Sequence, residues 1–204
     1  MSKDVVVVLD FGGQYNQLIA RRVREAGVYC EMLPFSTSLE ELKSKSLKGI
    51  IFSGGPNSVY DKGAPRVDEG IFELGVPVLG ICYGMQLMAQ MLGGEVVPSA
   101  LREYGKREYV IEEQSPLVDG AFIENTCWMS HTDQLKRLPD GFRNLGSTET
   151  TPHAVMGDDS RRLYGIQFHP EVKHTPDGQK LLENFLFKVC GCSKNWSMDS
   201  YIDD

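Results

Sequence analysis

The first half of the chain alternates between short apolar runs and amphipathic segments. Residues 4–9 (D-V-V-V-V-L) form a β-branched run typical of a strand covered on both faces of a parallel sheet. Similar runs at 28–33, 49–52 and 76–81 predict three more strands. The helical patterns between and after them lie at 14–26, 39–45, 65–74 and 84–92. This βαβαβαβα order implies right-handed crossovers and a parallel sheet.

The second half has a different pattern. Short alternating stretches predict added antiparallel strands, at 109–112, 127–129, 145–147 and 154–156. Residues 162–168 predict a further strand, and 178–190 an amphipathic helix. The predicted fold is therefore α/β, with an open, mostly parallel, flavodoxin-like central sheet flanked by helices and with added antiparallel strands. We expect one domain over 1–190, followed by a polar segment at 191–204.

Composition narrows the class of protein. With 204 residues, 41% of them hydrophobic and 24% charged, the chain matches a soluble globular domain. A net charge of −7 argues against nucleic acid or an anionic membrane as partner. The longest near-apolar run, 76–81, is too short to span a bilayer, and the N-terminus lacks the apolar region of a signal peptide. Five cysteines in no even framework indicate free thiols in a reducing cytosol, so we expect a cytoplasmic protein.

One cysteine lies at the junction between a predicted strand and a predicted helix, in Gly80-Ile81-Cys82-Tyr83-Gly84. A nucleophile held on a sharp strand-to-helix bend needs small residues two positions before and after it, and Gly80 and Gly84 meet that need. Such a bend sets the sulfur at the positive end of the following helix, which favours a thiolate. The alternative is a buried cysteine at a strand end beside ordinary turn glycines, and the pattern alone leaves both open.

A thiolate nucleophile needs a proton shuttle, and His169 is the best candidate. It directly follows the strand predicted at 162–168, so it lies at the same sheet edge as Cys82. In extended chain, residues two apart point to the same side, so Glu171 can hold the His169 ring. The alternative is a half-buried histidine with a solvated glutamate. Together with the predicted bend at Cys82, the pair favours a Cys-His-Glu triad.

Acyl transfer also needs donors for the developing oxyanion. The backbone N–H of Tyr83 can supply one, and Gly55 in the loop Ser53-Gly54-Gly55-Pro56 can supply another. The same loop resembles the pyrophosphate loop S-G-G-x-D-S of ATP pyrophosphatases. Here Pro56 removes one backbone donor and Asn57 replaces the acid, so we reject nucleotide binding by this loop.

The remaining histidines and cysteines give no metal site. His131 and His153 lack a partner such as Glu171 and are interpreted as structural, and His174 as a surface loop residue. Cys190 and Cys192 lie far along the sequence from any second liganding pair. The two other cysteines lie in apolar strand patterns typical of core thiols, at Cys30 and Cys127.

Taken together, these features resemble the class I (triad-type) glutamine amidotransferases over nearly the whole chain. Within that family the resemblance is nearest to the glutaminase domains of GMP synthases. The stretches that carry it are 10–31, 53–59, G-V-P-V-L-G-I-C-Y-G-M-Q at 75–86, W-M-S-H-T-D at 128–133, Y-G-I-Q-F-H-P-E-V at 164–172 and L-E-N-F at 182–185. The first and fourth stretches, with C-G-C and Trp196 near the end, favour the GMP synthase group.

The resemblance implies roles for individual residues. Cys82 attacks the carboxamide of glutamine, His169 protonates the leaving ammonia, and water then hydrolyses the thioester. Gln86 would hold the amino-acid end of the substrate. The strand end at 128–133 would line the same pocket through its backbone, with Ser130, His131, Thr132 and Asp133. No cofactor is implied for this domain; ATP and Mg²⁺ are expected only in a synthetase domain.

Two positions depart from the family pattern: Gly13, where the family usually has Ser, and Thr132, where it has Gly. Thr132 constrains a backbone that contacts glutamine, which fits a family whose hydrolysis is weak until the ammonia-using domain engages. Residues 191–204 resemble the bridge into an ATP pyrophosphatase domain, so we expect the chain to be the N-terminal part of a longer enzyme that aminates XMP to GMP.

Other interpretations are less consistent with the motifs. A glutaminase of anthranilate or aminodeoxychorismate synthase lacks the W-M-S-H and C-G-C stretches, and a non-catalytic relative has no need of an intact Cys/His/Glu set. The DJ-1/PfpI-like fold also holds a cysteine on a bend, but without a distant H-x-E at a later strand end.

Overall fold

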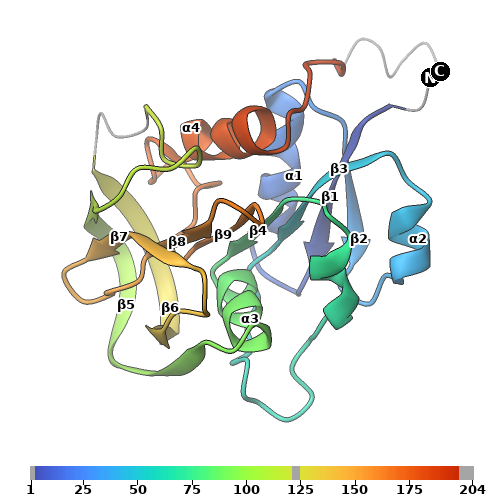
Figure 1. Cartoon of the computed structure of the whole chain (residues 1–204). Helices are drawn as coiled ribbons and strands as arrows, with labels where there is room; N and C mark the ends of the chain where they lie inside the picture. The colour runs from blue at the N-terminus through green and yellow to red at the C-terminus, as the bar shows by residue number, and fades with distance from the viewer. Residues whose placement is uncertain (1–2, 121–124, 198–204) are drawn as a thin grey trace.

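The computed structural model describes residues 3–120 and 125–197, in which nine strands form one sheet of order β2-β1-β3-β4-β9-β8-β7-β5-β6 (Figure 1). The first five strands in this order run parallel. Their bounds are β2 (Cys30–Pro34), β1 (Val5–Asp10), β3 (Leu47–Phe52), β4 (Val78–Ile81) and β9 (Leu163–Ile166). The predicted parallel half is therefore confirmed, and β9 joins it beside β4 from far along the sequence.

The remaining strands are antiparallel, as predicted, but two are much longer than expected. They are β8 (Val155–Asp158), β7 (Arg143–Thr148), β5 (Glu95–Ile111) and β6 (Thr126–Arg137). β5 pairs first with β6 and then, from Tyr109, with β7. Its pairing slips between Pro98 and Glu103, and Gly105 has φ of 90°. Such breaks hide a long strand in the sequence pattern.

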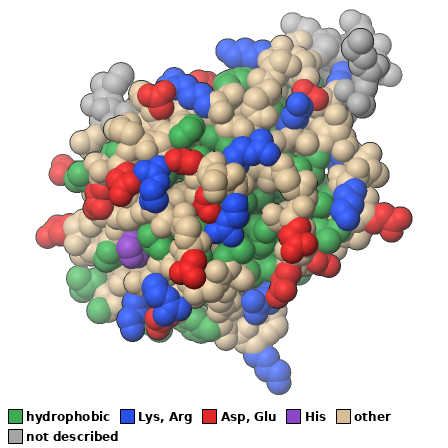
Figure 2. Space-filling model, in the orientation of Figure 1, with side chains coloured by type: hydrophobic (Ala, Val, Ile, Leu, Met, Phe, Trp, Pro, Cys, Tyr) green, Lys and Arg blue, Asp and Glu red, His purple; other side chains and the backbone are tan. Residues whose placement is uncertain are grey.

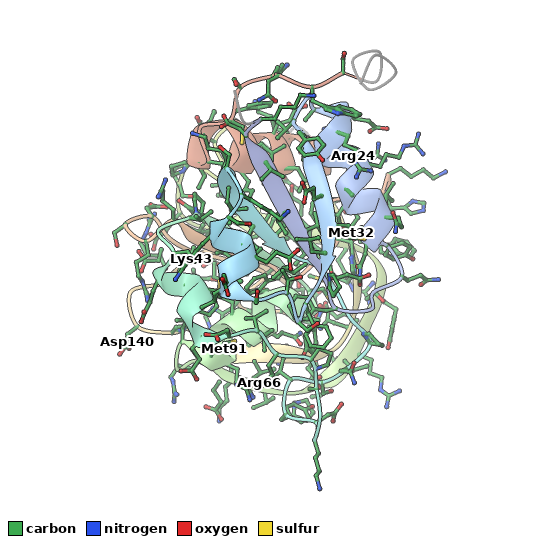
Figure 3. All side chains as sticks on the ribbon, turned by 90° about the vertical axis from the view of Figure 1, so that its right-hand side faces the viewer. Arg24, Met32, Lys43, Arg66, Met91 and Asp140 are labelled. Carbon is green, nitrogen blue, oxygen red and sulfur yellow. The ribbon has the colours of Figure 1, made fainter. Side chains whose placement is uncertain are left out.

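Helices cover both faces of the sheet. On one face lie α1 (Asn16–Glu25), α4 (Gly178–Glu183) and the π-helix η2 (Asn184–Val189), packed on alternate residues of the parallel strands. On the other lie α2 (Leu39–Lys43), the 3₁₀ helix η1 (Glu69–Glu73) and α3 (Tyr83–Met91). Figure 3 looks onto the β2 edge, with Arg24 of α1 and Lys43 of α2 on either side of the strands.

Two predicted helices differ from the structure. The helix expected over 65–74 is reduced to the single 3₁₀ turn η1, capped by the Asp68 side chain, which accepts from the Gly70 N–H. Glycine weakens a helix interior, which accounts for the shortened element. The helix expected over 178–190 is α4 continued by η2, whose wider turn is accompanied by hydrogen bonds from the Asn184 side chain to Leu117 and Asp119 carbonyls.

The described part of the segment after 190 packs against the domain. The N–H groups of Asn195 and Trp196 donate to the Gly27 carbonyl, and Cys192 N–H donates to Leu186. The boundary at 190 and the linker role of 191–204 stay predictions, and residues 198–204 lie outside the described residues.

The surface carries interspersed charges of both signs on the face shown in Figure 2. Within the described residues, every helix is too short or too polar to cross a bilayer.

Cys30 and Cys127 are buried in the core, as predicted. This burial raises the pKa of each thiol to about 12.

Candidate active site

Cys82 lies on a sharp bend between β4 and α3. Its backbone has φ of 52° and ψ of −109°, a conformation that L-residues rarely adopt. A Cβ on Gly80 would lie 2.6 Å from the Gly84 backbone, and one on Gly84 would lie 2.5 Å from the Phe52 carbonyl oxygen. Both glycines are therefore required by close backbone packing, and the predicted bend is present. Strain of this kind is kept where the position of a side chain matters.

His169 and Glu171 lie together just after β9. The His169 Nδ1 is 2.7 Å from Glu171 Oε1, and both side chains are buried. The backbone of His169 is fixed on both sides, because its N–H donates to the Trp128 carbonyl and its own carbonyl accepts from the Thr175 hydroxyl. The Tyr15 ring packs edge-on against the imidazole, with ring centres 5.4 Å apart. The imidazole is therefore held in one orientation.

The imidazole faces Cys82. Both residues line a cavity of about 280 Å³, and a Cβ on Gly54 would lie 3.3 Å from His169 Cε1 and 3.7 Å from Cys82 Cβ. Burial alone would lower the pKa of His169, but hydrogen bonds to Cys82 and Glu171 raise it well above its usual value. This arrangement stabilises a proton on the imidazole beside the sulfur, and an acid placed there can protonate a leaving group.

The two predicted oxyanion donors border the same sulfur. Gly55 lines the cavity that contains His169, and its backbone is pressed against Phe11, since a Cβ there would lie 2.7 Å from the Phe11 carbonyl oxygen. Tyr83 is the first residue of α3, whose first-turn N–H groups have no partner within the helix. Gly55 and Tyr83 both line a second cavity, to which Cys82 also contributes. Their role as donors stays a prediction.

The second cavity, of about 190 Å³, contains every residue assigned to the substrate by resemblance. These are Gln86 from α3 and Ser130, His131, Thr132 and Asp133 from β6. Gln86 is buried, and its Nε2 donates to the Asp133 carbonyl and to Gln167 Oε1, each at 3.0 Å. The cavity therefore joins the nucleophile to a polar wall formed by β6 and α3.

Two of these residues use their side chains for the fold. The Asp133 carboxylate accepts from the hydroxyls of Ser58 and Tyr60. His131 Nδ1 lies 2.7 Å from the Asp133 carbonyl oxygen, and its Nε2 lies 3.0 Å from Glu103 Oε2. The interpretation that His131 lacks a carboxylate partner is thus wrong. Its partner comes from the neighbouring strand β5 and is invisible to a rule based on residues two apart.

Sequence reasoning missed two buried polar residues at the site, Glu103 and Gln167. Glu103 sits in an alternating strand and carried no signal. Gln167 carried one, because residues two apart share a side of an extended chain and it lies two before His169. Its Nε2 lies 3.6 Å from the Cys82 sulfur, while the Cys82 thiol also faces the Ser130 carbonyl at 3.6 Å.

The other candidate groups lie elsewhere. His153 Nδ1 lies 3.1 Å from the Asn144 side-chain oxygen, and burial lowers its pKa. His174 is exposed beside Trp128, as predicted for a surface residue. Over residues 3–120 and 125–197 no three His, Cys, Asp or Glu side chains are arranged to hold a metal ion. The Cys190 and Cys192 thiols are paired by a hydrogen bond to each other.

Comparison with known proteins agrees with this geometry. Residues 7–189 match the family model "Glutamine amidotransferase class-I". The chain is 55% identical over 202 residues to a GMP synthase [glutamine-hydrolyzing] of Clostridium perfringens, covering 99% of this chain and 40% of that protein. It is 56% identical over 203 residues to the protein of that name from Acetivibrio thermocellus, with coverage of 100% and 40%. The chain thus spans about two fifths of the length of these relatives.

Solved structures share the fold. A Thermoplasma acidophilum protein, provisionally described as part of a GMP synthase, superposes with a TM-score of 0.82 at 28% identity, covering 100% of this chain and 98% of that one. A glutamine amidotransferase of Thermotoga maritima gives a TM-score of 0.72 at 16% identity, with coverage of 94% and 100%, and supports the fold alone. Given the match over residues 7–189, this chain belongs to the class I glutamine amidotransferase family.

Proposed function

We propose that the chain is the glutaminase part of a GMP synthase and hydrolyses glutamine to glutamate and ammonia through a thioester on Cys82. The observation that carries the proposal is the strained Cys82 backbone, which holds the thiol beside an imidazole that is itself bound to a buried carboxylate. The family match and the relatives of the same name support it. No cofactor takes part in the proposed reaction.

In the first half-reaction, the Cys82 thiolate attacks the side-chain carbonyl carbon of glutamine and a C–S bond forms. The C–N bond then breaks, and His169 gives its proton to the departing nitrogen, which leaves as ammonia. Glu171 stabilises the charged ring and keeps Nδ1 facing the carboxylate. The raised pKa of His169 suits it to hold that proton until the amine departs.

In the second half-reaction, water replaces ammonia at the thioester. The now neutral His169 takes a proton from the attacking water, the C–S bond breaks, and glutamate leaves with the proton returned to the Cys82–His169 pair. In each half-reaction the carbonyl oxygen becomes negative. The N–H groups of Gly55 and Tyr83 are assigned to that oxygen, because both residues border Cys82 in the second cavity.

The second cavity is assigned to the substrate glutamine. Gln86 Nε2 has two hydrogens, and both are donated, to Asp133 and Gln167. Gln86 can therefore offer the substrate only its carbonyl oxygen, an acceptor that matches the α-ammonium group. Ser130 and Thr132 contribute backbone to the same wall. His131 and Asp133 are assigned an indirect part, because their side chains are held by Glu103, Ser58 and Tyr60.

The fate of the ammonia is proposed from the relatives. The proteins matched at 55–56% identity are GMP synthases more than twice as long as the match. We assign the ammonia to ATP-dependent amination of XMP by an ATP pyrophosphatase domain, with residues 191–204 as the link toward it. ATP and Mg²⁺ would bind only in that domain. A cytoplasmic location fits both the glutaminase part and the ATP pyrophosphatase domain.

The experiment measures glutamate release from glutamine by the wild type and by Cys82→Ala, each with and without a separately expressed synthetase domain supplied with ATP, Mg²⁺ and XMP. We expect a low wild-type rate that rises with the complete partner, and no release by Cys82→Ala under either condition. Equal rates for the two proteins would show that Cys82 is not the nucleophile. A wild type without activity under both conditions would favour a binding-only role.

A further inference from the structure

Resting on the proposed role of Cys82, we propose that Gln167 is a further catalytic residue: its side-chain amide donates a hydrogen bond to the Cys82 thiolate, and Gln86 positions that amide. Gln167 Nε2 lies 3.6 Å from Cys82 Sγ, and the Gln167 side chain is fully buried. The resemblance to the family gave Gln167 no role.

The direction of the Gln167 amide follows from its neighbours. The Asp133 backbone oxygen can only accept, so the Gln86 atom that faces it at 3.0 Å is the NH₂ group. The same Gln86 nitrogen lies 3.0 Å from the Gln167 side chain, which must present its oxygen there. The NH₂ group of Gln167 is then the group that faces the sulfur. A single backbone carbonyl thus sets two amides through a chain of hydrogen bonds.

A donor at this place matters because the backbone group that faces the sulfur is an acceptor. The Ser130 carbonyl lies 3.6 Å from Cys82 Sγ and can accept a proton from a thiol but gives nothing to a thiolate. The Gln167 amide donates to the sulfur and so offsets the preference of the Ser130 carbonyl for the protonated thiol. His169 must give up its proton when ammonia leaves, whereas the Gln167 amide keeps its hydrogens throughout. Gln167 can therefore stabilise the sulfur as it is released from the thioester.

The chain of hydrogen bonds also joins the substrate wall to the nucleophile. It starts at the Asp133 carbonyl on β6, passes through the side chains of Gln86 and Gln167, and ends at the Cys82 sulfur. A ligand that moves the Gln86 side chain would therefore also move the Gln167 amide that faces the sulfur.

Besides Cys82, the titratable side chains that line the two cavities are Tyr15, Tyr83, Tyr104, His131, Asp133, His169 and Glu171.

The test is the pH profile of Cys82 alkylation by iodoacetamide without glutamine, followed by mass spectrometry of the Cys82 peptide. Gln167→Glu keeps the side-chain shape but turns an acceptor toward the sulfur, and Gln167→Met keeps the bulk without a donor. We expect the midpoint of the profile to rise by about one pH unit or more in Gln167→Glu, and by less in Gln167→Met. Asn184→Asp is the matched control. It makes the same change from amide to carboxylate at a buried side chain that donates to the Leu117 and Asp119 carbonyls.

Profiles of both Gln167 variants that superpose on the wild type would overturn the proposal, even if glutamate release fell. A shift of equal size in Asn184→Asp would do the same, because it would reveal a general loss of packing. Should Gln167→Glu fail to fold, Gln86→Met provides the second test, since it leaves Gln167 in place without its anchor and should raise the midpoint too. The alkylation profile needs no turnover, so a wild type without glutaminase activity would defeat the proposed function separately.

Discussion

The domain contains two buried histidine–carboxylate pairs, and they differ in the second group that each imidazole contacts. In the pair His169–Glu171, formed by residues two apart in sequence, the ring contacts the carboxylate and also Cys82. In the pair His131–Glu103, formed across two strands, the ring contacts the carboxylate and also the Asp133 backbone carbonyl. A backbone carbonyl can only accept a hydrogen bond, whereas a thiol can lose its proton. The second contact of the ring, more than the presence of a carboxylate, is therefore what separates the proposed catalytic histidine from the structural one.

The two carboxylates differ in the same direction. Glu103 is surrounded by donors, with the hydroxyls of Thr150 and Thr151 on its oxygens and Arg107 at 3.6 Å. Glu171 bonds through Oε1 to His169, while its Oε2 is buried and has no hydrogen-bond partner among the described residues. A fully bonded carboxylate contributes to the fold, whereas one with spare acceptor capacity is retained at a cost in stability. The second arrangement is the one expected of a functional group.

The largest expected effect comes from His169→Asn. Removing the proposed acid and base of both half-reactions should lower kcat/KM for glutamine by about 10³-fold or more, while the protein stays folded. Steady-state glutamate release measures the rate, and circular dichroism checks the fold. His131→Asn provides the comparison. An equal loss of kcat in both folded variants would erase the proposed difference between the two histidines.

Glu103→Ala should have the next largest effect, and on stability. It leaves His131 and the surrounding threonine hydroxyls buried without their common acceptor, at a cost of about 3 kcal/mol of unfolding free energy. Urea denaturation followed by fluorescence measures this cost. Unchanged stability would mean that the Glu103 cluster is not a structural centre.

Glu171→Gln should act mainly on the rate. The amide keeps the size of the side chain but no longer stabilises a charged ring, so kcat should fall by about 10²-fold. The unfolding free energy should change less than in Glu103→Ala, because only one hydrogen bond of the carboxylate is lost. The same urea and glutamate assays compare the two variants directly. A variant that loses stability but keeps kcat would reverse the assignment of the pairs.

The smallest expected effect is a pH dependence of stability. The folded-state pKa of His169 is raised above its usual value of 6.5, so the folded protein binds its proton more tightly than the unfolded chain. This contribution is fully present below pH 6.5 and is lost as the pH rises through the folded-state pKa. The stability difference between wild type and His169→Gln should therefore shrink from about pH 6 toward alkaline pH. A difference that is constant or grows would contradict the raised pKa.

The sequence predicts best where local rules are sufficient. The β-branched run 4–9 and the paired glycines around Cys82 specify the parallel half and the bend, because strand burial and backbone crowding are read from adjacent residues. His169 and Glu171 meet for a similar reason, since both belong to one short stretch of chain. Their catalytic roles stay predictions until activity is measured.

The parts that were missed depend on distant residues. Glu103 reaches His131 only because β5 pairs with β6, and no pattern within either strand announces that contact. The length of β5 is hidden by Pro98, where the pairing shifts, and by Gly105, which stays paired with Met129 despite its positive φ. Gln167 was accessible to the rule that found Glu171, but a buried amide has no charge or nucleophile to attract notice. Sequence patterns therefore miss buried polar groups whose partners lie on other strands, as for Glu103, or whose side chains are neutral, as for Gln167.

The most direct test of the central claim is covalent labelling with a diazo-ketone analogue of glutamine, mapped by mass spectrometry on the folded, reduced protein. If Cys82 is the nucleophile of a glutaminase, the adduct should form on the Cys82 peptide, should be suppressed by excess glutamine, and should leave Cys30, Cys127, Cys190 and Cys192 unmodified. No adduct on Cys82, or an adduct on another cysteine that glutamine suppresses, would contradict the account.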